Sequence, residues 1–387
     1  MKLPGHWQTR QLGELARVIY GGARPAENGP FPVIGSGGIY GSASKPLVSY
    51  ETIVIGRKGS AGSVFYSPTP CHPSDTTFYL AWKEEIHVPF VYNFLLFKGI
   101  APDRSVIPSL QRGDVESIII PFPPLPEQRT IAHVLGVIQA AREARQREVS
   151  LERERKAALM AHLFTHGTRG EPTKQTPIGE MPVSWEVKEL GEVCDIRYGL
   201  GQPPELAEDG VPMIRATDIK AGRIVSEGVV RAKREAIPGG RNPFLEVGDI
   251  IVVRSGAYTG DVAVYDGRWE SAIVGYDLVA RPKNERANPV YLASFLLNER
   301  GARYFRSQRD RSAQPHLNAE QLRKAVLPFP PPTEQKEVAD ISRACDAKIA
   351  ALERESALLD ELFRALLEEL MTGRVAVAGM DATDDNG

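Results

Sequence analysis

Short apolar runs, rich in β-branched and aromatic residues, recur along most of the chain between clusters of Gly, Pro and Ser. Such runs predict strands joined by tight turns. They come in two sets, at residues 51–55, 63–66 and 76–82 and at residues 249–254, 262–265 and 273–280. Residues 89–98 and 289–308 predict a helix after each set, because proline suits the first helical position. The pattern therefore predicts two small α+β domains.

A different pattern, with apolar residues at alternating steps of three and four, runs from Glu334 to Met371. This spacing predicts a helix with a coiled-coil seam, about 57 Å long at roughly 1.5 Å per residue. Residues 127–166 show the same spacing at both ends, but residues 142–156 are mostly charged, so one continuous helix is an open question there. The seam residues of the second helix are Val338, Ile341, Cys345, Ile349, Leu352, Leu359, Phe363, Leu366 and Leu370, interrupted by Ser356.

The two long segments differ in charge. Residues 127–166 hold seven Lys or Arg and five Asp or Glu, whereas residues 334–371 hold five and ten. The net charges of +2 and −5 favour pairing of the two helices. An antiparallel pair would allow one long helix to follow each domain.

The same proline-rich cassette precedes both long helices. It reads Pro-Phe-Pro-Pro and then Glu-Gln, at residues 121–128 and again at residues 328–335, 207 positions later. Proline fixes φ and lacks an N–H, so the run predicts an extended connector and not a helix interior or a central strand. The Glu that follows suits a helix start, where unpaired N–H groups favour a carboxylate.

The openings of the two predicted domains repeat as well. Trp7 and Tyr20 recur as Trp185 and Tyr198, each 178 residues later. An internal duplication on this scale indicates two copies of one domain. The predicted organisation is a domain at 1–121, a connector and long helix at 122–168, a linker at 169–183, a second domain at 184–328, a second connector and helix at 329–373, and a disordered acidic tail at 374–387.

Composition narrows the class of protein. The chain has 387 residues, of which 42% are hydrophobic and 25% charged, as in soluble globular proteins of two or three domains. The three cysteines lie far apart, which argues against a disulfide framework or a zinc site and predicts a cytoplasmic location. No apolar run approaches the roughly 18 residues that a membrane span needs. With a net charge of −2, any surface that binds nucleic acid must be local.

Motifs for catalysis are weak. The glycine-rich residues 35–38 open no helix in a βαβ unit, which argues against a dinucleotide or S-adenosylmethionine loop. Residues 56–62 lack the ending of a nucleoside-triphosphate loop. Asp218 and Lys220 form a faintly nuclease-like pattern that is common by chance. The residues therefore predict a binding protein with no catalytic, metal or cofactor site.

Two basic, glycine-rich loops are the strongest functional signal, because residues 56–62 and 254–260 follow equivalent predicted strands. Glycine permits close backbone approach, and Arg can pair with guanine or contact a phosphate. The candidate DNA-binding residues in these loops are Arg57, Lys58, Ser60, Arg254, Ser255 and Tyr258.

The segments just before the cassettes supply a second group of candidates, because Gln and Asn side chains can read adenine. These candidates are Gln111, Arg112, Gln314, His316 and Asn318. A run of arginines spaced mostly three apart would also suit a phosphate backbone. It comprises Arg300, Arg303, Arg306, Arg309 and Arg311.

Taken together, the cassettes, the repeated openings and the basic loops resemble the DNA specificity subunit of a type I restriction-modification system. The resemblance covers nearly the whole chain and includes the helix ends at residues 163–167 and 370–373. It implies an α+β fold with two similar target-recognition domains, separated by two long helices that form an antiparallel coiled coil, in a pseudo-two-fold internal repeat. Each domain would read one half of an interrupted double-stranded DNA site.

The resemblance also implies partners. Two methylation subunits and the restriction subunits would join the chain on DNA, and S-adenosylmethionine, ATP and Mg²⁺ would bind to those partners. The residues leave two alternatives. One is a structural interaction protein that binds other proteins through its duplicated domains and Pro-rich cassettes, and the other is a nuclease that uses Asp218 and Lys220.

Overall fold

The computed structural model describes residues 3–25, 27–101, 109–240, 242–309 and 316–375. Contacts within the chain divide it into two compact units. Unit 1 comprises Met1–Arg147 and Arg354–Gly387, and unit 2 comprises Glu148–Glu353. Each unit therefore combines one domain with segments of both long helices.

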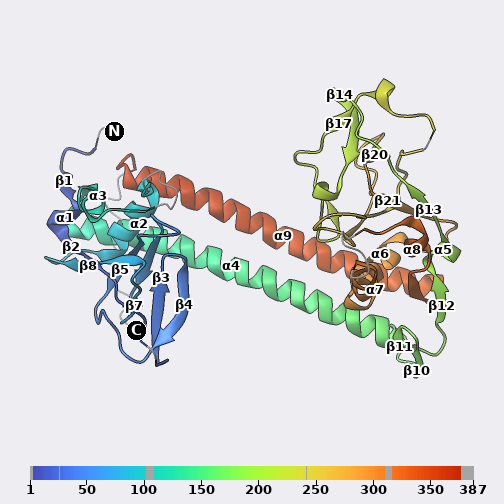
Figure 1. The fold of residues 1–387 in the computed structure, drawn as a ribbon, viewed down its shortest axis with the longest axis horizontal. Coiled ribbons are helices and arrows are strands. Elements are labelled where there is room, and N and C mark those ends of the chain that lie inside the picture. Colours follow the sequence, from blue (N-terminus) through green and yellow to red (C-terminus); the bar gives the residue numbers. More distant parts are fainter. Residues whose placement is uncertain (1–2, 26, 102–108, 241, 310–315, 376–387) are drawn as a thin grey trace. The chain divides into compact units, whose positions relative to one another are not determined.

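Unit 1 is built on a four-stranded antiparallel sheet of order β2-β8-β5-β6 and a three-stranded sheet of order β4-β3-β7 (Figure 1). A third pairing joins the first strand of the domain, β1, to the last, β9. The strands are β1 (Gln8–Gln11), β2 (Ala16–Tyr20), β3 (Phe31–Gly35), β4 (Gly38–Ala43), β5 (Thr52–Gly56), β6 (Val64–Ser67), β7 (His72–Pro73), β8 (Thr77–Trp82) and β9 (Ile119–Phe122). The helices of this domain are α1 (Leu12–Leu15), α2 (Val88–Lys98) and α3 (Arg112–Glu116).

Unit 2 repeats the strand order and the strand pairing of this arrangement. Its four-stranded sheet has the order β13-β21-β18-β19, its three-stranded sheet the order β17-β14-β20, and β12 pairs with β22. The strands are β12 (Glu186–Glu189), β13 (Cys194–Tyr198), β14 (Leu206–Ile214), β17 (Arg231–Ala232), β18 (Ile250–Val252), β19 (Val262–Val264), β20 (Ile273–Val274), β21 (Leu278–Pro282) and β22 (Val326–Phe329). The helices are α5 (Leu190–Val193), α6 (Pro289–Leu297), α7 (Glu299–Arg309) and α8 (Ala319–Arg323). The predicted duplication is therefore confirmed.

Unit 2 also carries elements that have no partner in the sheet order of unit 1. A small hairpin, β15 (Ile219–Lys220) and β16 (Arg223–Ile224), and two 3-10 turns, η1 (Ala216–Asp218) and η2 (Arg234–Ala236), lie between β14 and β18. These residues account for much of the extra length of the second domain.

The structure corrects three predicted elements. Residues 273–280 form two strands that belong to different sheets, because Ile273 and Val274 pair with β14, whereas the strand that begins at Leu278 pairs with β13 and β18. Residues 289–308 form two helices, because Asn298 has an extended backbone and its side chain accepts from the N–H of Arg300 at 3.1 Å, a cap that starts α7. The predicted linker contains a hairpin of β10 (Thr173–Thr176) and β11 (Gly179–Pro182).

The two long helices are continuous, α4 over Leu125–His166 and α9 over Pro332–Met371. The charged stretch 142–156 does not interrupt α4, and several of its cations pair with carboxylates of α9. In unit 1, Arg142 lies 2.5 Å from Asp360 and Arg145 lies 3.1 Å from Glu355. In unit 2, Arg153 pairs with Glu353 at 2.7 Å and Lys156 with Asp346 at 2.6 Å. Within each unit the pairs run in opposite directions along the two helices, so the segments are antiparallel, as predicted.

Apolar packing, more than charge, holds each helix pair to its domain, since exposed ion pairs contribute little to stability. In unit 1, Ile131 and Leu135 of α4 share a buried cluster with Phe363 and Leu370 of α9 and with Trp7 of the domain. At one turn of α9, Leu367 is buried, whereas the predicted Leu366 is only partly buried against the same cluster. In unit 2, the corresponding cluster contains Phe164, Trp185, Phe295 and Val338.

The cassettes join each domain to its long helix. Pro121 and Pro328 lie in β9 and β22, two-stranded edge pairings that tolerate proline. Most residues of these strands are buried, so this part of the proline-rich cassette is not an exposed ligand for another protein.

The glutamine of each cassette is buried and forms hydrogen bonds on both sides. Gln335 Nε2 donates to the carbonyls of Pro330 at 2.9 Å and Arg286 at 3.0 Å, and its Oε1 accepts from the N–H of Asn288 at 2.8 Å. In unit 1, Gln128 makes the equivalent contacts with Pro123 and His87.

We predict that Gln335→Ala lowers the free energy of unfolding by about 2 to 3 kcal/mol, because it leaves buried backbone groups without partners. Urea denaturation followed by circular dichroism measures the change. Gln175→Ala, at an exposed position in β10 of the same unit, is the matched control and should have an effect near zero. Equal stability of the two variants would show that the buried amide is dispensable.

Candidate nucleic-acid interface

In each unit the predicted basic loop lies against the segment that leads into the small helix α3 or α8. In unit 1, Lys58 and Ser109 form a β-bridge, and the N–H of Leu110 donates to the carbonyl of Arg57 at 2.9 Å. In unit 2, Ser255 bridges His316, and the N–H of Leu317 donates to the carbonyl of Arg254 at 2.8 Å. Each domain therefore joins its basic loop to the segment before its small helix. The equivalent residues of the two domains lie 197 to 207 positions apart in the sequence.

The turn before the last strand of each four-stranded sheet also meets the basic loop. The N–H of Arg57 donates to the carbonyl of Thr76 at 2.8 Å. The N–H of Arg254 donates to Asp277 Oδ1 at 3.1 Å.

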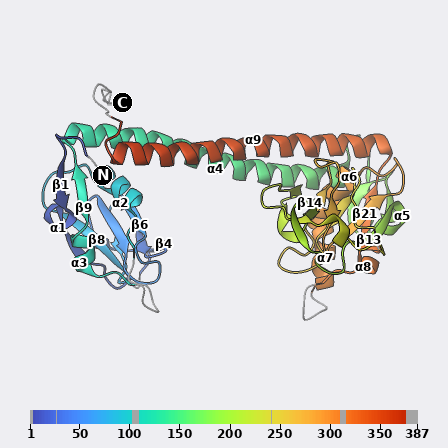
Figure 2. The same ribbon diagram turned by 90° about the horizontal axis from the view of Figure 1, so that it is seen from above.

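A fourth segment, after β3 or β14, completes the group. The N–H of Ser36 lies 3.4 Å from Thr76 Oγ1, and Ser63 Oγ donates to the carbonyl of Ser36 at 2.5 Å. In unit 2, the N–H of Gly275 reaches Ile214 next to Arg215. We name these groups the loop clusters: residues 36–37, 56–62, 74–76 and 109–111 in unit 1, and residues 215–218, 253–260, 275–277 and 316–318 in unit 2. In each unit α3 or α8, which the last segment leads into, lies on the side of the domain away from the long helices (Figure 2).

Each loop cluster holds one arginine against aromatic rings. The guanidinium carbon of Arg254 lies 4.7 Å from the ring centroid of Tyr198 and 4.4 Å from that of Tyr276. The guanidinium carbon of Arg57 lies 5.3 Å from the ring centroid of Tyr20 and 6.0 Å from that of Phe78. Stacking of this kind holds the planar guanidinium in one orientation and contributes about 0.5 to 2 kcal/mol per contact.

Hydrogen bonds fix one edge of each guanidinium. Arg57 Nη2 donates to the carbonyl of Asp75 at 2.7 Å, whereas Arg254 Nη2 donates to Nε2 of His316. Burial and the neighbouring Arg254 lower the pKa of His316, so its ring is neutral near pH 7 and can accept this hydrogen bond. Among the described residues, Nε of neither arginine has an acceptor. These Nε atoms are buried, so the donor of each arginine that remains open to a ligand is Nη1, which makes no hydrogen bond to the described residues.

The other predicted residues have different environments. Lys58, Ser60 and Gln111 are exposed, Tyr258 is 48% exposed, and Ser255 is partly buried. Arg112 is exposed but pairs with Glu116 at 2.7 Å.

Three further candidates are less available or undescribed. Asn318 caps α8, because its side chain accepts from the N–H of Gln321 at 2.8 Å, so its role is structural. Arg309 ends α7, but its side chain lies outside the described residues, as do Arg311 and Gln314.

The predicted arginine stripe does not form one surface. Arg300 is partly buried and donates to the carbonyls of Ile178 and Phe164, both at 2.9 Å, so its guanidinium is held by the C-terminal turn of α4 and the β10–β11 turn. Arg306 pairs with Glu299. Of the described part of the stripe, Arg303 remains as an exposed cation on α7.

Asp218, which the nuclease alternative requires, forms an ion pair inside the domain. Asp218 is buried, and both of its oxygens accept from Arg215 at 3.0 Å. No group of three or more His, Cys, Asp or Glu among the described residues could hold a metal ion. Within the same residues, no helix is both long enough and apolar enough to cross a bilayer.

Sequence reasoning missed two features of the unit 2 loop cluster. The first is Tyr276, which stacks on Arg254 and is 49% exposed. The second is a pocket of about 390 Å³ between the cluster, residues 200–203 and Met213. The repeat of Tyr20 as Tyr198 was visible in the sequence, but nothing there placed either ring on an arginine. The pocket is lined by Leu200, Gln202, Pro203, Met213, Arg215, Ala216, Thr217, Ser255, Gly275, Tyr276 and Asp277.

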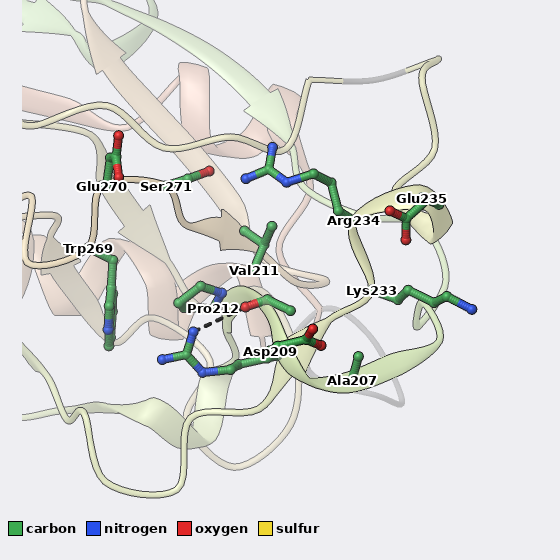
Figure 3. A pocket seen from close by; sticks show the side chains of 12 residues that line it. Ala207, Asp209, Val211, Pro212, Lys233, Arg234, Glu235, Trp269, Glu270 and Ser271 are labelled. Carbon is green, nitrogen blue, oxygen red and sulfur yellow. Dashed lines mark hydrogen bonds between the residues drawn. The ribbon is translucent and has the colours of Figure 1, made fainter.

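A second pocket of about 430 Å³ in unit 2 lies between β14, β17, η2 and the segment before β20 (Figure 3). Trp269 and Glu270 stand on one side, with Lys233 and Glu235 on the other. Acidic and basic side chains are mixed in its lining, and Lys233 pairs with Glu205 at 3.2 Å. The pocket therefore selects no single charge.

Comparison with known proteins points to one family. Residues 4–153 and 182–361 match the sequence pattern of the family described as type I restriction modification DNA specificity domain. The chain is 25% identical over 413 residues to the type I restriction enzyme MjaVIII specificity subunit of Methanocaldococcus jannaschii, and the match covers 98% of this chain and 96% of that protein. It is 23% identical over 380 residues to the type I restriction enzyme EcoDI specificity subunit of Escherichia coli, with 87% and 80% covered.

Solved structures share the fold. The crystal structure of the type I restriction-modification system S subunit from M. genitalium matches with a TM-score of 0.66 at 17% identity, over 96% of this chain and 98% of that one. A structure described as showing complex assembly and conformational transition of the type I R-M system matches with a TM-score of 0.55 at 16% identity, over 97% and 100%.

We predict that Asp277→Asn stabilises the protein at alkaline pH. Burial raises the pKa of Asp277 from 3.8 to about 6, although the Arg254 N–H opposes the shift. Between about pH 4 and 6 the folded state binds more protons than the unfolded chain, so the free energy of unfolding falls as pH rises. This loss of stability is complete above about pH 6. At pH 8 the variant should gain about 2 to 3 kcal/mol, at about 1.4 kcal/mol per pKa unit, and should lose this gain near pH 4.

Urea denaturation across this pH range measures the difference between variant and wild type. Asp75→Asn, which removes a carboxylate at an exposed position in the loop cluster of unit 1, is the matched control. A gain that persists at pH 4 would assign the effect to something other than the carboxylate charge.

Proposed function

Because this chain belongs to the family of type I restriction modification DNA specificity domains, we propose that its two units read the two halves of an interrupted target in double-stranded DNA. One observation carries this proposal. Both units enclose a loop cluster at an equivalent place, and each cluster holds one arginine stacked on aromatic rings. Two copies of one DNA-binding domain suit a target that has two separate half-sites.

The stacked arginines are suited to base recognition. A guanidinium donates two parallel hydrogen bonds to O6 and N7 of guanine in the major groove, and each such pair is worth about 1 to 3 kcal/mol of discrimination. The aromatic rings hold Arg57 and Arg254 in place before DNA arrives, so little side-chain entropy is lost on binding. The two arginines have different hydrogen-bond partners, Asp75 and His316, which suits half-sites of different sequence.

Other residues of the loop clusters would complete the contacts. Lys58, Ser60 and Gln111 would act in unit 1, and Ser255, Tyr258 and His316 in unit 2. Arg112 would contact DNA only after release from Glu116. Arg309, Arg311 and Gln314 stay predictions from the sequence alone.

The long helices would set the interval between the half-sites. The continuous α4 and the antiparallel ion pairs in each unit support this proposal. A rigid spacer would make binding depend on the number of base pairs in the gap.

The remaining components would come from partners. Two methylation subunits and the restriction subunits would bring S-adenosylmethionine, ATP and Mg²⁺, and this chain would itself be non-catalytic and cytoplasmic. The complex described for one structural relative supports a multi-subunit assembly.

Methylation-site sequencing of host DNA, with and without this gene, tests the proposal. We expect one interrupted motif to lose its methylation when the gene is deleted. A duplex-binding assay with the methylation subunits present separates the interaction-protein alternative, which predicts no sequence preference at any salt concentration. Metal-dependent cleavage by the isolated chain would support the nuclease alternative instead.

We predict that Arg254→Ala relaxes discrimination in one half-site by about 1 to 3 kcal/mol and leaves the other half-site unchanged. Fluorescence anisotropy with duplexes mutated in one half at a time measures this. Arg57→Ala is the matched variant and should affect the opposite half. Arg254→Lys keeps the charge but loses the planar fork, so it should behave like Arg254→Ala. Equal weakening on every duplex would identify Arg254 as a phosphate contact.

A further inference from the structure

The pocket in the loop cluster of unit 2 has apolar walls and a polar rim. Leu200, Pro203, Met213 and Ala216 line it with carbon atoms. Ser255, Tyr276 and Thr217 come from three different segments of the loop cluster. The pocket is therefore part of the surface that we propose reads DNA.

Side chains of both charges surround the pocket. Arg215 lines it, and Arg254 precedes the lining residue Ser255. Asp277 also lines the pocket, but one of its carboxylate oxygens accepts from the N–H of Arg254. Arg215 donates to both oxygens of Asp218, so charge alone does not select the occupant. Most of the lining belongs to the loop cluster that we propose contacts DNA, so an apolar group of the nucleic acid is the occupant that this position favours.

Base chemistry then selects the occupant. In the major groove the four base pairs present hydrogen-bond donors and acceptors, and only thymine adds a methyl group. Polar edges lose hydrogen bonds to water when they are buried against apolar walls, which costs free energy, whereas a methyl group gains free energy from the same burial.

We propose that this pocket binds the 5-methyl group of a thymine, so that the half-site read by unit 2 contains an A·T base pair at that position. The proposal rests on the function proposed above and adds one specificity-determining subsite to it. Ala216 and Leu200 line the pocket with small or aliphatic surface. Apolar side chains of this kind contact thymine methyl groups in other complexes.

Unit 1 differs at the corresponding positions. After the matching Tyr-Gly pairs, unit 1 has Gly22 where unit 2 has Leu200. Two residues after the matching isoleucines, unit 1 has Ser36 where unit 2 has Ala216. Replacement of an aliphatic wall by glycine and of alanine by serine removes apolar surface. The methyl subsite is therefore assigned to unit 2.

The test uses the full chain with its methylation subunits and duplexes that carry the target mapped by methylation sequencing. The half-site of unit 2 is the one whose discrimination changes in Arg254→Ala. Each thymine in that half-site is replaced in turn by deoxyuridine, which removes only the methyl group. We expect one replacement to weaken binding about fourfold, the effect of losing one buried methyl group.

Two matched variants place the effect in the pocket. Ala216→Met places a longer apolar side chain where we propose that the methyl group binds, so thymine and deoxyuridine duplexes should bind equally. Ala207→Met makes the same change in the other pocket of unit 2 and should keep the fourfold difference. Circular dichroism confirms that both variants are folded.

Several results would overturn the proposal. They are a unit 2 half-site without an A·T pair, a wild-type protein that binds every deoxyuridine duplex as tightly as thymine, or a methyl effect that survives in folded Ala216→Met. The wild-type measurement decides the question even if Ala216→Met fails to fold. Loss of all sequence preference on unmodified duplexes would instead refute the proposed function, so the two failures are distinguishable.

Discussion

A buried glutamine amide in each cassette is the interaction on which the rest of each unit depends. Gln335 is fully buried, and its amide contacts the connector at Pro330 and the residues just before α6. Gln128 occupies the same place in unit 1. Because buried backbone groups without partners are costly, the domain and its long helix must keep one relative position within the unit. The proline run makes this possible, since it removes donors that the connector could not have satisfied.

The same arrangement also explains the Glu beside each Gln, although the two units use it differently. In unit 2, Glu334 accepts from Trp185 Nε1 at 2.9 Å and from the N–H of Thr168 at 2.8 Å, which ties the end of α4 to the start of α9. In unit 1, Glu127 contacts His6 at 3.0 Å, and Trp7 Nε1 is without a partner among the described residues. The duplicated framework therefore tolerates different local pairings as long as the buried amide is kept.

The loop clusters show how the same backbone framework can present different DNA-binding side chains. Backbone hydrogen bonds from Leu110 and Leu317 to the arginine carbonyls are the same in both units. Side-chain contacts are not, since Arg57 donates to a backbone carbonyl and Arg254 to an imidazole. Backbone pairing depends little on side-chain identity, so it can hold the loops in place while the exposed side chains vary. Stacking on aromatic rings adds rigidity without using the hydrogen-bond donors that recognition needs.

Local patterns in the sequence determined the elements and their duplication. Apolar periodicity depends only on neighbouring residues, and it identified the long helices and most strands. The matched cassettes and openings identified two copies of one domain, because repeated motifs can be compared without knowing the structure. The basic loops around Arg57 and Arg254 were also visible. Only the tertiary structure decided which side chains are available. It turned Arg300 toward the end of α4, made Asn318 a helix cap and placed Tyr276 on Arg254. It also enclosed a pocket from segments 200–217, 255 and 275–277, since contacts between residues distant in sequence leave no periodic signal.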